Sequence, residues 1–353
     1  MHWLRAMANR RVGVLGDFML DSYVWGNATR LSPEAAVPVV DFVEESECPG
    51  GAGNVASNLA ALGARVSAFG TRGEDAEGIR LQEALAARGI EARGVLADRA
   101  RRTTLKTRII ARHQQLVRVD RETRAPLGGE MEEKLIAKAI GALKGGRGTK
   151  GIEALVISDY DKGTVTEELA RRVLAVCVKL GVPAFVKPKW SMLETYPGAS
   201  AIVLNSAEAG FLVTRPVEDD ESAEFAGAQL LEKFKSSAVV LTRGARGMMV
   251  FEPGARPLRI AALSQERPYG ARSSTTRTIE HGQQVFDVTG AGDTALATLA
   301  LAVAAGAPIR EAARLGNAAA GIVVSKLGTA TVSSEELGTL VREMKGREAC
   351  LDF

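Results

Sequence analysis

The sequence contains few cysteines and no cysteine motif. Cys48, Cys177 and Cys350 lie far apart in the chain of 353 residues, and no two of them form a CxxC pair. This spacing argues against a disulfide framework and against a structural zinc site. It favours a reducing cytoplasm as the compartment of the protein.

Long apolar stretches are also missing. The longest apolar run, Ala295 to Ala305, is about half of the ~20 residues that span a bilayer, so we expect it to form a buried helix. The opening segment MHWLRAMANR is basic but lacks the apolar region of a secretory signal. We therefore expect no export signal and no membrane partner.

Neither sign of charge dominates the chain. Lys and Arg number 45 against 42 Asp and Glu, giving a net charge of +3 that is mixed along the sequence, so a nucleic-acid partner is disfavoured. With 46% apolar and 25% charged residues, the composition is that of an ordinary globular protein. Two nucleotide-binding motifs are absent: GxxxxGK[ST], and a GxGxxG directly after the first predicted strand. Any phosphoryl transfer must therefore use a different scaffold.

Short β-branched runs alternate with helix-length amphipathic segments along most of the chain. This alternation predicts an α/β fold with a mostly parallel sheet covered by helices on both faces. Thr164 and Glu167 resemble a capping box that opens a helix ending at Gly181, and Ser333 and Glu336 resemble another. The predicted strands are Arg11 to Leu15, Val66 to Gly70, Ala154 to Ser158, Pro183 to Val186, Ala201 to Leu204 and Ala238 to Thr242.

Two segments, Ser22 to Glu47 and Thr103 to Asp120, contain strand-forming residues without a helix between strands. They could pair as a small separate sheet that acts as a lid or packs on the lid of a second subunit, or they could extend the edge of the main sheet. Three cations of the second segment, Lys106, Arg108 and Arg112, share one face of an alternating strand. A cationic face over a cleft suits an anionic substrate, although solvated surface charges would give the same pattern.

The most informative segment is VFDVTGAGDTALATLALAVAAG. A short strand ends at Asp287, a glycine-rich turn follows, and Asp293 stands at the start of an apolar helix. The backbone amides of Gly290, Ala291 and Gly292 would form an anion hole at the positive end of this helix. Asp293 could act as a general base for phosphoryl transfer or could simply cap the helix.

Two further motifs lie near the N-terminus. GDFMLD (Gly16 to Asp21) places two carboxylates just beyond the first strand, where open α/β sheets bind ligands. PGGAGN then places a glycine turn before a helix that has Asn54 near its start. Each motif alone has ordinary structural explanations.

In combination and order, GDFMLD, PGGAGN, NSAE, TRGARG and DVTGAGD resemble the ribokinase-type (PfkB) carbohydrate kinases from about Val12 to Leu337. The resemblance implies a ribokinase-like three-layer αβα sandwich with a small β-sheet lid. We expect one kinase domain over residues 11–345, with lid segments 22–47 and 103–120 inserted within it. It also implies ATP and Mg²⁺ as cofactors, with a monovalent cation as a further candidate.

The segments RLSPEAAVPVV, RHQQLVRVD, SDYDKG and NAAAGIVVSKLGTATVS resemble the D-glycero-D-manno-heptose-7-phosphate kinases. That family phosphorylates the anomeric hydroxyl of the sugar phosphate on the way to ADP-heptose and the lipopolysaccharide core, and its kinase is often fused to a nucleotidyltransferase. This sequence matches the kinase half. The alternatives are a kinase for another sugar or sugar phosphate, or a weakly catalytic regulatory protein that binds a sugar phosphate. A homodimer formed through the lid is expected.

The resemblance also assigns roles to individual residues. Asp293 would be the base, Gly290, Ala291 and Gly292 the anion hole, and Asp21, Gly51 and Asn54 the ligands of the sugar hydroxyls. Asn205 and Glu208 would position Mg²⁺, with Glu208 acting through water, and would hold the triphosphate. The nucleotide side would be lined by Thr242, Gly244, Gly247 and Asn317. Lys106 and Arg108 are assigned to the sugar phosphate by charge alone.

The sequence departs from the heptose kinases at two places. It reads VKPKW where they usually read VDPKG, so Lys187 replaces an acidic residue near the phosphates. This lysine could contact phosphates in place of a metal interaction, could be structural, or could impair catalysis. The segment Ser264 to Gly282 is also longer, and it could alter nucleotide choice or be a disordered loop.

Overall fold

A nine-stranded sheet forms the centre of the protein. The computed structural model describes residues 2–112, 114–146, 150–189, 196–262, 290–326 and 330–351. The seven strands from β11 to β5 run parallel, and β12 and β13 add an antiparallel edge. Across the sheet the order is β13 (Leu258–Ile260), β12 (Met248–Phe251), β11 (Val239–Thr242), β10 (Ala201–Asn205), β9 (Ala184–Lys187), β8 (Ala154–Ser158), β1 (Arg11–Gly16), β4 (Arg65–Gly73) and β5 (Glu91–Asp98).

The prediction of a parallel α/β sheet is confirmed, and all six predicted strands lie in this sheet. Each begins within one residue of its predicted start. The strands are continuously apolar because both faces of the sheet are covered. In β1, for example, Val12 and Val14 face one apolar core and Leu15 faces the other.

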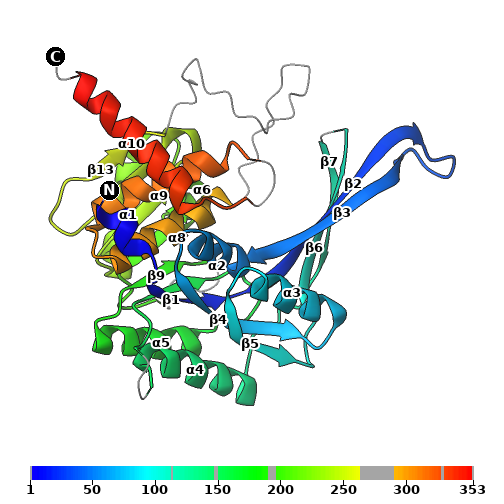
Figure 1. Cartoon of the computed structure of the whole chain (residues 1–353), viewed down its shortest axis with the longest axis horizontal. Coiled ribbons are helices and arrows are strands. Elements are labelled where there is room, and N and C mark those ends of the chain that lie inside the picture. The colour runs from blue at the N-terminus through cyan, green and yellow to red at the C-terminus, as the bar shows by residue number, and fades with distance from the viewer. Residues whose placement is uncertain are drawn as a thin grey trace.

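Helices form a layer on each face of the sheet (Figure 1). The first core contains α8, which is apolar around its whole circumference and is buried as predicted. The helices of this layer are α1 (His2–Met7), α2 (Ala52–Ala61), α3 (Ala76–Ala86), α8 (Ala291–Ala304), α9 (Ile309–Val323) and α10 (Ser334–Leu351). Those of the other layer are α4 (Gly129–Lys144), α5 (Glu167–Leu180), α6 (Ser206–Leu212) and α7 (Asp220–Phe234).

The two segments that break the alternation pair with each other in a separate four-stranded sheet, which we call the lid. Its strands are β3 (Pro38–Gly51), β2 (Phe18–Leu31), β6 (Thr104–Ala111) and β7 (Gln114–Arg121), in that order. The lid projects from one side of the main body as a long twisted ribbon (Figure 1). The alternative of an edge extension is therefore wrong.

The helix caps were predicted with mixed success. Helix α5 is capped by Thr166, whose side chain accepts a hydrogen bond from the Leu169 amide, and it ends at Gly181 in a left-handed conformation. The predicted cap at Thr164 is wrong, because its hydroxyl lies 3.0 Å from that of Thr71 instead. The capping box of Ser333 and Glu336 is present. Within the described segments, no helix combines the length and the apolar character that a bilayer crossing needs.

Candidate active site

The carboxyl ends of the parallel strands bring the predicted site residues to one edge of the sheet. Ser158, the last residue of β8, is the register partner of Lys187, the last residue of β9. Asn205 and Thr242 are the corresponding partners at the ends of β10 and β11. The chain passes from β1 directly into β2, so the lid rises from this same edge. This is the edge at which open α/β sheets bind ligands.

Asp293 lies in the first turn of α8, and both of its carboxylate oxygens are engaged. Its Oδ1 accepts hydrogen bonds from Tyr160 Oη at 2.6 Å and from Lys187 Nζ at 2.6 Å, while Oδ2 accepts one from Asn54 Nδ2 at 3.0 Å. The N-cap residue of α8 is Gly290, which adopts a φ of 84° that glycine tolerates without strain. No side chain caps α8, so the interpretation of Asp293 as a simple cap is wrong. Asp293 is buried, with 6% of its surface exposed.

Lys187 is a charged partner of Asp293. Burial alone would lower the pKa of Lys187, but the carboxylate of Asp293 and the neighbouring Tyr160 raise it above its ordinary value. The side chain therefore stays an ammonium, with 16% of its surface exposed. The departure seen in the sequence thus places a cation in direct contact with the predicted base.

Tyr160 was quoted in the SDYDKG motif but was not predicted to belong to the site. Burial and the adjacent Asp293 carboxylate raise the pKa of Tyr160, so its hydroxyl stays protonated and donates a hydrogen bond to Asp293. The turn that carries Tyr160 is held by Asp17, whose carboxylate accepts hydrogen bonds from the amides of residues 160, 162 and 164. Asp17, one of the two carboxylates of GDFMLD, therefore has a structural role.

Asn54 is oriented by a chain of buried polar groups between α2 and α8. Asn58 Nδ2 donates to Asn54 Oδ1 at 3.2 Å and to the Asn54 carbonyl at 2.9 Å. Thr294 Oγ1 in turn donates to Asn58 Oδ1 at 3.0 Å. Gly51, the N-cap of α2, has a φ of 58°, a backbone conformation that glycine adopts without strain. Asn58 and Thr294 were missed because the contact between them joins residues 236 positions apart in the sequence.

Asp21 is paired with Arg108 across the lid. Arg108 Nη1 lies 2.7 Å from Asp21 Oδ1, and its guanidinium stacks on the Tyr23 ring. Burial raises the pKa of Asp21 above its ordinary value, although Arg108 and Lys106 favour its charged form. The predicted shared face holds for Lys106 and Arg108 but not for Arg112, which lies beyond β6 with a φ of 50°. Lys106 contacts Asp120 and Glu122.

Asn205 and Glu208 form a reciprocal cap at the start of α6. The Glu208 amide donates to Asn205 Oδ1 at 2.8 Å, and the Asn205 amide donates to Glu208 Oε2 at 2.9 Å. The remaining oxygen, Oε1, lies 2.7 Å from Lys189 Nζ. Both oxygens of Glu208 therefore have partners.

A hollow of about 440 Å³ begins where β10 and β11 end. Of the predicted nucleotide residues, Asn205, Thr242 and Gly244 line it, and Gly247 closes the short turn that follows. Asn317 lies apart on α9, where Nδ2 donates to the Ala261 carbonyl at 2.8 Å. The predicted strand end at Asp287 and the segment Ser264 to Gly282 lie outside the described residues.

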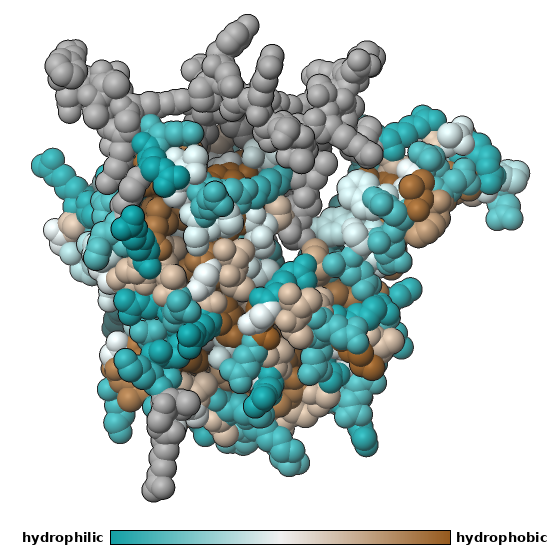
Figure 2. Space-filling model, in the orientation of Figure 1, coloured by the Kyte–Doolittle hydropathy of each residue, from teal (hydrophilic) through white to brown (hydrophobic). Residues whose placement is uncertain are grey.

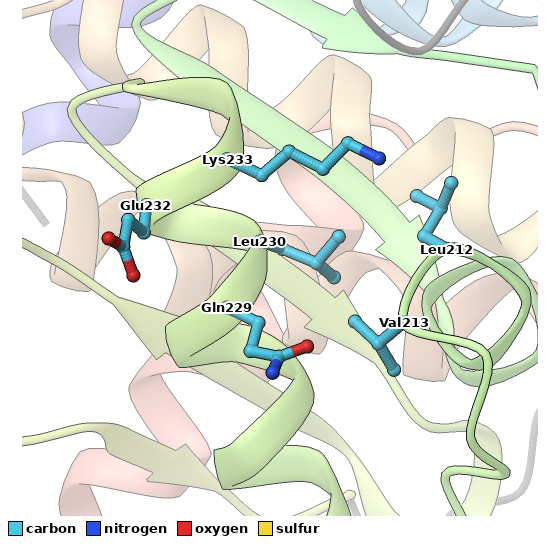
Figure 3. Close-up of a pocket in the computed structure, with 6 residues that line it drawn as sticks. All are labelled: Leu212, Val213, Gln229, Leu230, Glu232 and Lys233. Atoms are coloured by element: carbon cyan, nitrogen blue, oxygen red, sulfur yellow. The ribbon is translucent and has the colours of Figure 1, made fainter.

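A second hollow, of about 280 Å³, lies between α6 and α7 (Figure 3). Leu212 and Val213 point toward Leu230 across it, whereas Glu232 points away. None of the predicted site residues lines this hollow. It has no part in the site at the strand ends.

Asp159, a second carboxylate absent from the predicted set, links two of the site turns. Its carboxylate accepts hydrogen bonds from Tyr196 Oη at 2.9 Å, from the Asp161 amide at 2.8 Å and from the Lys189 amide at 3.4 Å. Burial, together with repulsion from the Asp17 carboxylate, raises the pKa of Asp159 to about 6. Asp159 thereby joins the turn that carries Tyr160 to the segment that carries Lys189.

The chain is similar to known proteins over most of its length. A family model described as pfkB family carbohydrate kinase matches residues 9–336. The bifunctional protein HldE of Pelobacter propionicus is 40% identical over 324 residues, which are 92% of this chain and 62% of that protein. HldE of Geobacter sulfurreducens is 41% identical over 92% of this chain and 61% of its own length. The chain thus spans about three fifths of the length of these relatives.

Solved structures share the fold at lower sequence identity. Arabidopsis thaliana ribokinase complexed with ribose and ATP aligns over 94% of this chain and 98% of its own, with a TM-score of 0.68 and 19% identity. Escherichia coli phosphofructokinase-2 in complex with fructose-6-phosphate aligns over 96% and 99%, with a TM-score of 0.71 and 19% identity. The predicted ribokinase-like fold is confirmed.

Proposed function

The chain belongs to the pfkB family of carbohydrate kinases, and from this premise we propose that its acceptor is D-glycero-D-manno-heptose 7-phosphate, phosphorylated by ATP at the anomeric hydroxyl. The likeness to the HldE proteins over 92% of the chain supports this acceptor, as do the segments RLSPEAAVPVV and RHQQLVRVD. Residues 11–345 would form the kinase domain, with the two lid segments inserted in it.

The observation that carries the proposed chemistry is the buried carboxylate of Asp293 in the first turn of α8. Lys187 and Tyr160 occupy Oδ1, and Asn54 takes one lone-pair direction of Oδ2. The other lone pair of Oδ2 is the position at which an acceptor hydroxyl would leave its proton. The hydroxyl oxygen then bonds to the γ-phosphorus, the bond from this phosphorus to the β-phosphate oxygen breaks, and ADP leaves.

The groups around Asp293 complete the proposed site. The amides of Gly290, Ala291 and Gly292 would stabilise the negative charge of the transferring phosphoryl group. Asp21, Gly51 and Asn54 would contact the sugar, and Lys106 and Arg108 would face its phosphate. The hollow lined by Asn205, Thr242 and Gly244 would take the nucleotide, with Gly247 in the turn that follows and Glu208 capping α6 together with Asn205. Asn317, which lies apart on α9, is assigned to the adenine side by the family resemblance alone.

The described side chains do not fit a magnesium ion held directly by the protein. Both oxygens of Glu208 are engaged by Lys189 and by the Asn205 amide, and Lys187 stands where an acidic residue is usual. No group of three or more His, Cys, Asp or Glu side chains within the described ranges could hold a metal ion. We propose that Mg²⁺ accompanies ATP, and we assign no monovalent-cation site.

The expected homodimer would form through the lid. Several apolar side chains of its strands are exposed, among them Phe42, Val43, Val117 and Val119. The projecting arm shows hydrophobic surface among polar residues (Figure 2). A second lid covering these side chains would remove them from water.

The experiment that tests the proposed function is ADP release from Mg·ATP with a panel of sugars and sugar phosphates, run beside Asp293→Asn. Turnover on the heptose phosphate that disappears in the variant is the expected result. Turnover on another sugar alone would replace the acceptor and keep the chemistry. Tight binding of a sugar phosphate with no turnover on any acceptor would favour the regulatory alternative, for which the Lys187–Asp293 contact is the specific observation.

A further inference from the structure

Two lysines at the end of β9 each contact one of the two acidic residues that the family resemblance assigns to catalysis and to magnesium. Lys187 is the last residue of β9, and Lys189 follows two residues later. Lys187 Nζ lies 2.6 Å from Asp293 in the first turn of α8, and Lys189 Nζ lies 2.7 Å from Glu208 in the first turn of α6. One short segment therefore carries a cation to the N-terminus of each of two helices.

We propose that Lys187 and Lys189 form a phosphate-binding pair that holds the β- and γ-phosphates of ATP and supplies the positive charge that a protein-held metal ion would otherwise supply. The proposal rests on the function proposed above, because it assigns the phosphate contacts of the same site. The two ammonium groups would bridge the space from the nucleotide hollow to the base.

The position of Lys187 supports this assignment. Its Nζ lies 3.8 Å from the point that a Cβ of Gly292 would occupy, so the ammonium stands beside the predicted anion hole. Helix N-termini and cations both attract phosphate oxygens. Lys187 would therefore contact the phosphoryl group that is transferred.

Lys189 is connected through Glu208 and Asn205 to the nucleotide hollow. Its partner Glu208 shares the reciprocal cap with Asn205, and Asn205 lines the hollow beside Thr242 and Gly244. The Lys189 side chain retains 27% of its surface exposed, so a phosphate can reach it. Lys189 would contact the phosphate nearer to the nucleoside.

Both lysines keep hydrogen-bonding capacity for a ligand. An ammonium has three N–H donors. Among the described residues, Lys187 directs donors to Asp293 and, at 3.4 Å, to Tyr160, while Lys189 directs one to Glu208. Each can keep its carboxylate and still donate to a phosphate oxygen. The carboxylates hold the lysines in place and balance their charge before ATP arrives.

Binding of ATP without a divalent cation distinguishes this lysine pair from a site organised by a metal ion. If the lysines supply the charge, ATP must bind appreciably in EDTA, without any divalent cation. The dissociation constant of ATP is measured by calorimetry in EDTA and again in Mg²⁺ for the wild type, Lys187→Met, Lys189→Met and Lys187→Asp. AMP, which lacks the β- and γ-phosphates, is titrated in parallel. The matched control is Lys179→Met, which removes an exposed lysine at the end of α5.

We expect the wild type and Lys179→Met to bind metal-free ATP equally. Lys187→Met and Lys189→Met should each weaken that binding by about 10- to 100-fold, the loss of one hydrogen bond between charged groups. Binding of AMP should change less than about threefold. Lys187→Asp should abolish binding in EDTA and make ATP binding depend on Mg²⁺, because an acidic side chain repels phosphates unless a metal ion lies between them.

Two results would overturn the proposal: a wild type that binds ATP only with Mg²⁺, or methionine variants that bind metal-free ATP as tightly as the wild type. If Lys187→Met fails to fold, Lys187→Arg and the double variant Lys187→Met/Asp293→Asn carry the test, since the first keeps the charge and the second removes both charges. No sugar is present in these titrations. A wrong acceptor assignment would therefore leave the outcome unchanged.

Discussion

Lys187 Nζ and Asp293 Oδ1 lie 2.6 Å apart, although 106 residues separate them in the sequence. Lys187 is the last residue of the parallel strand β9, and Asp293 lies in the first turn of helix α8. The contact fixes the orientation of the predicted base through Oδ1, while Oδ2 accepts a hydrogen bond from Asn54.

Replacing Asp293 by asparagine should remove the base and lower kcat by about 10²- to 10⁴-fold, with a smaller effect on the KM for ATP. An amide cannot take the proton of the acceptor hydroxyl. Steady-state ADP release at saturating acceptor measures the effect. Retention of more than a tenth of the wild-type kcat would contradict the assignment of Asp293.

The same substitution should also destabilise the fold by about 1–3 kcal/mol, because it leaves the ammonium of Lys187 partly buried without a charged partner. The double variant Lys187→Met/Asp293→Asn should recover most of this stability and none of the activity. Thermal unfolding of the three proteins, followed by circular dichroism, separates the two effects. Equal melting temperatures of the single and double variants would show that the ion pair does not matter for stability.

Tyr160→Phe should lower kcat by about tenfold while the melting temperature changes little. The ring and its packing against Lys187 remain, and only the hydrogen bond that orients Asp293 is lost. The split between kcat and KM is the informative measurement, since Tyr160 acts through the base. A rise in KM with unchanged kcat would place Tyr160 in substrate binding instead.

Arg108→Ala should raise the KM for the sugar phosphate by at least about tenfold and leave the KM for ATP near the wild-type value. The variant removes the cation proposed to face the sugar phosphate and leaves Asp21 buried without its ion-pair partner. Arg99→Ala is the matched control, because its ion pair with Glu74 is exposed and contains none of the proposed site residues. An unchanged KM in Arg108→Ala would remove Arg108 from the sugar-phosphate site.

Asp159 should make stability fall as the pH rises from about 4 to about 6. Its pKa is raised from 3.8 to about 6 by burial and by Asp17, so in this interval the folded protein holds a proton that the unfolded chain has lost. The free energy of unfolding therefore decreases with pH, by up to about 3 kcal/mol from this group. The measurement is urea unfolding of the wild type and Asp159→Asn across this range. The wild type minus variant difference should decline toward pH 6, and a flat difference would refute the shift.

Phe42→Asp should weaken a dimer formed through the lid. Phe42 on β3 is 66% exposed, and a carboxylate there could not be buried against a second lid without a large desolvation cost. Light scattering after size exclusion should show a dimeric wild type and a variant shifted toward monomer. Val178→Asp on α5 is the control, since that side chain is exposed on the main body. A monomeric wild type would contradict the proposed dimer.

The sequence alone predicted the fold and most of the candidate residues, because both depend on local patterns. Apolar runs of strand length such as Ala154 to Ser158 reveal their burial directly, and the glycines before Asp293 indicate a tight turn into a helix. The motifs also identified the acidic and amide side chains at the strand ends. The roles of these residues remain predictions.

Tertiary structure decided which side chains meet. Tyr160 and Lys189 acquire their partners only when the parallel strands bring their carboxyl ends to one edge. Asn58 meets Thr294 only when α2 packs against α8. Thr164 was mistaken for a cap because its spacing to Glu167 is right, but its hydroxyl lies beside that of Thr71 on β4. The sequence determined that a lysine stands at position 187. Only the fold decided that its ammonium contacts the carboxylate of Asp293, because an ion pair depends on distance in space.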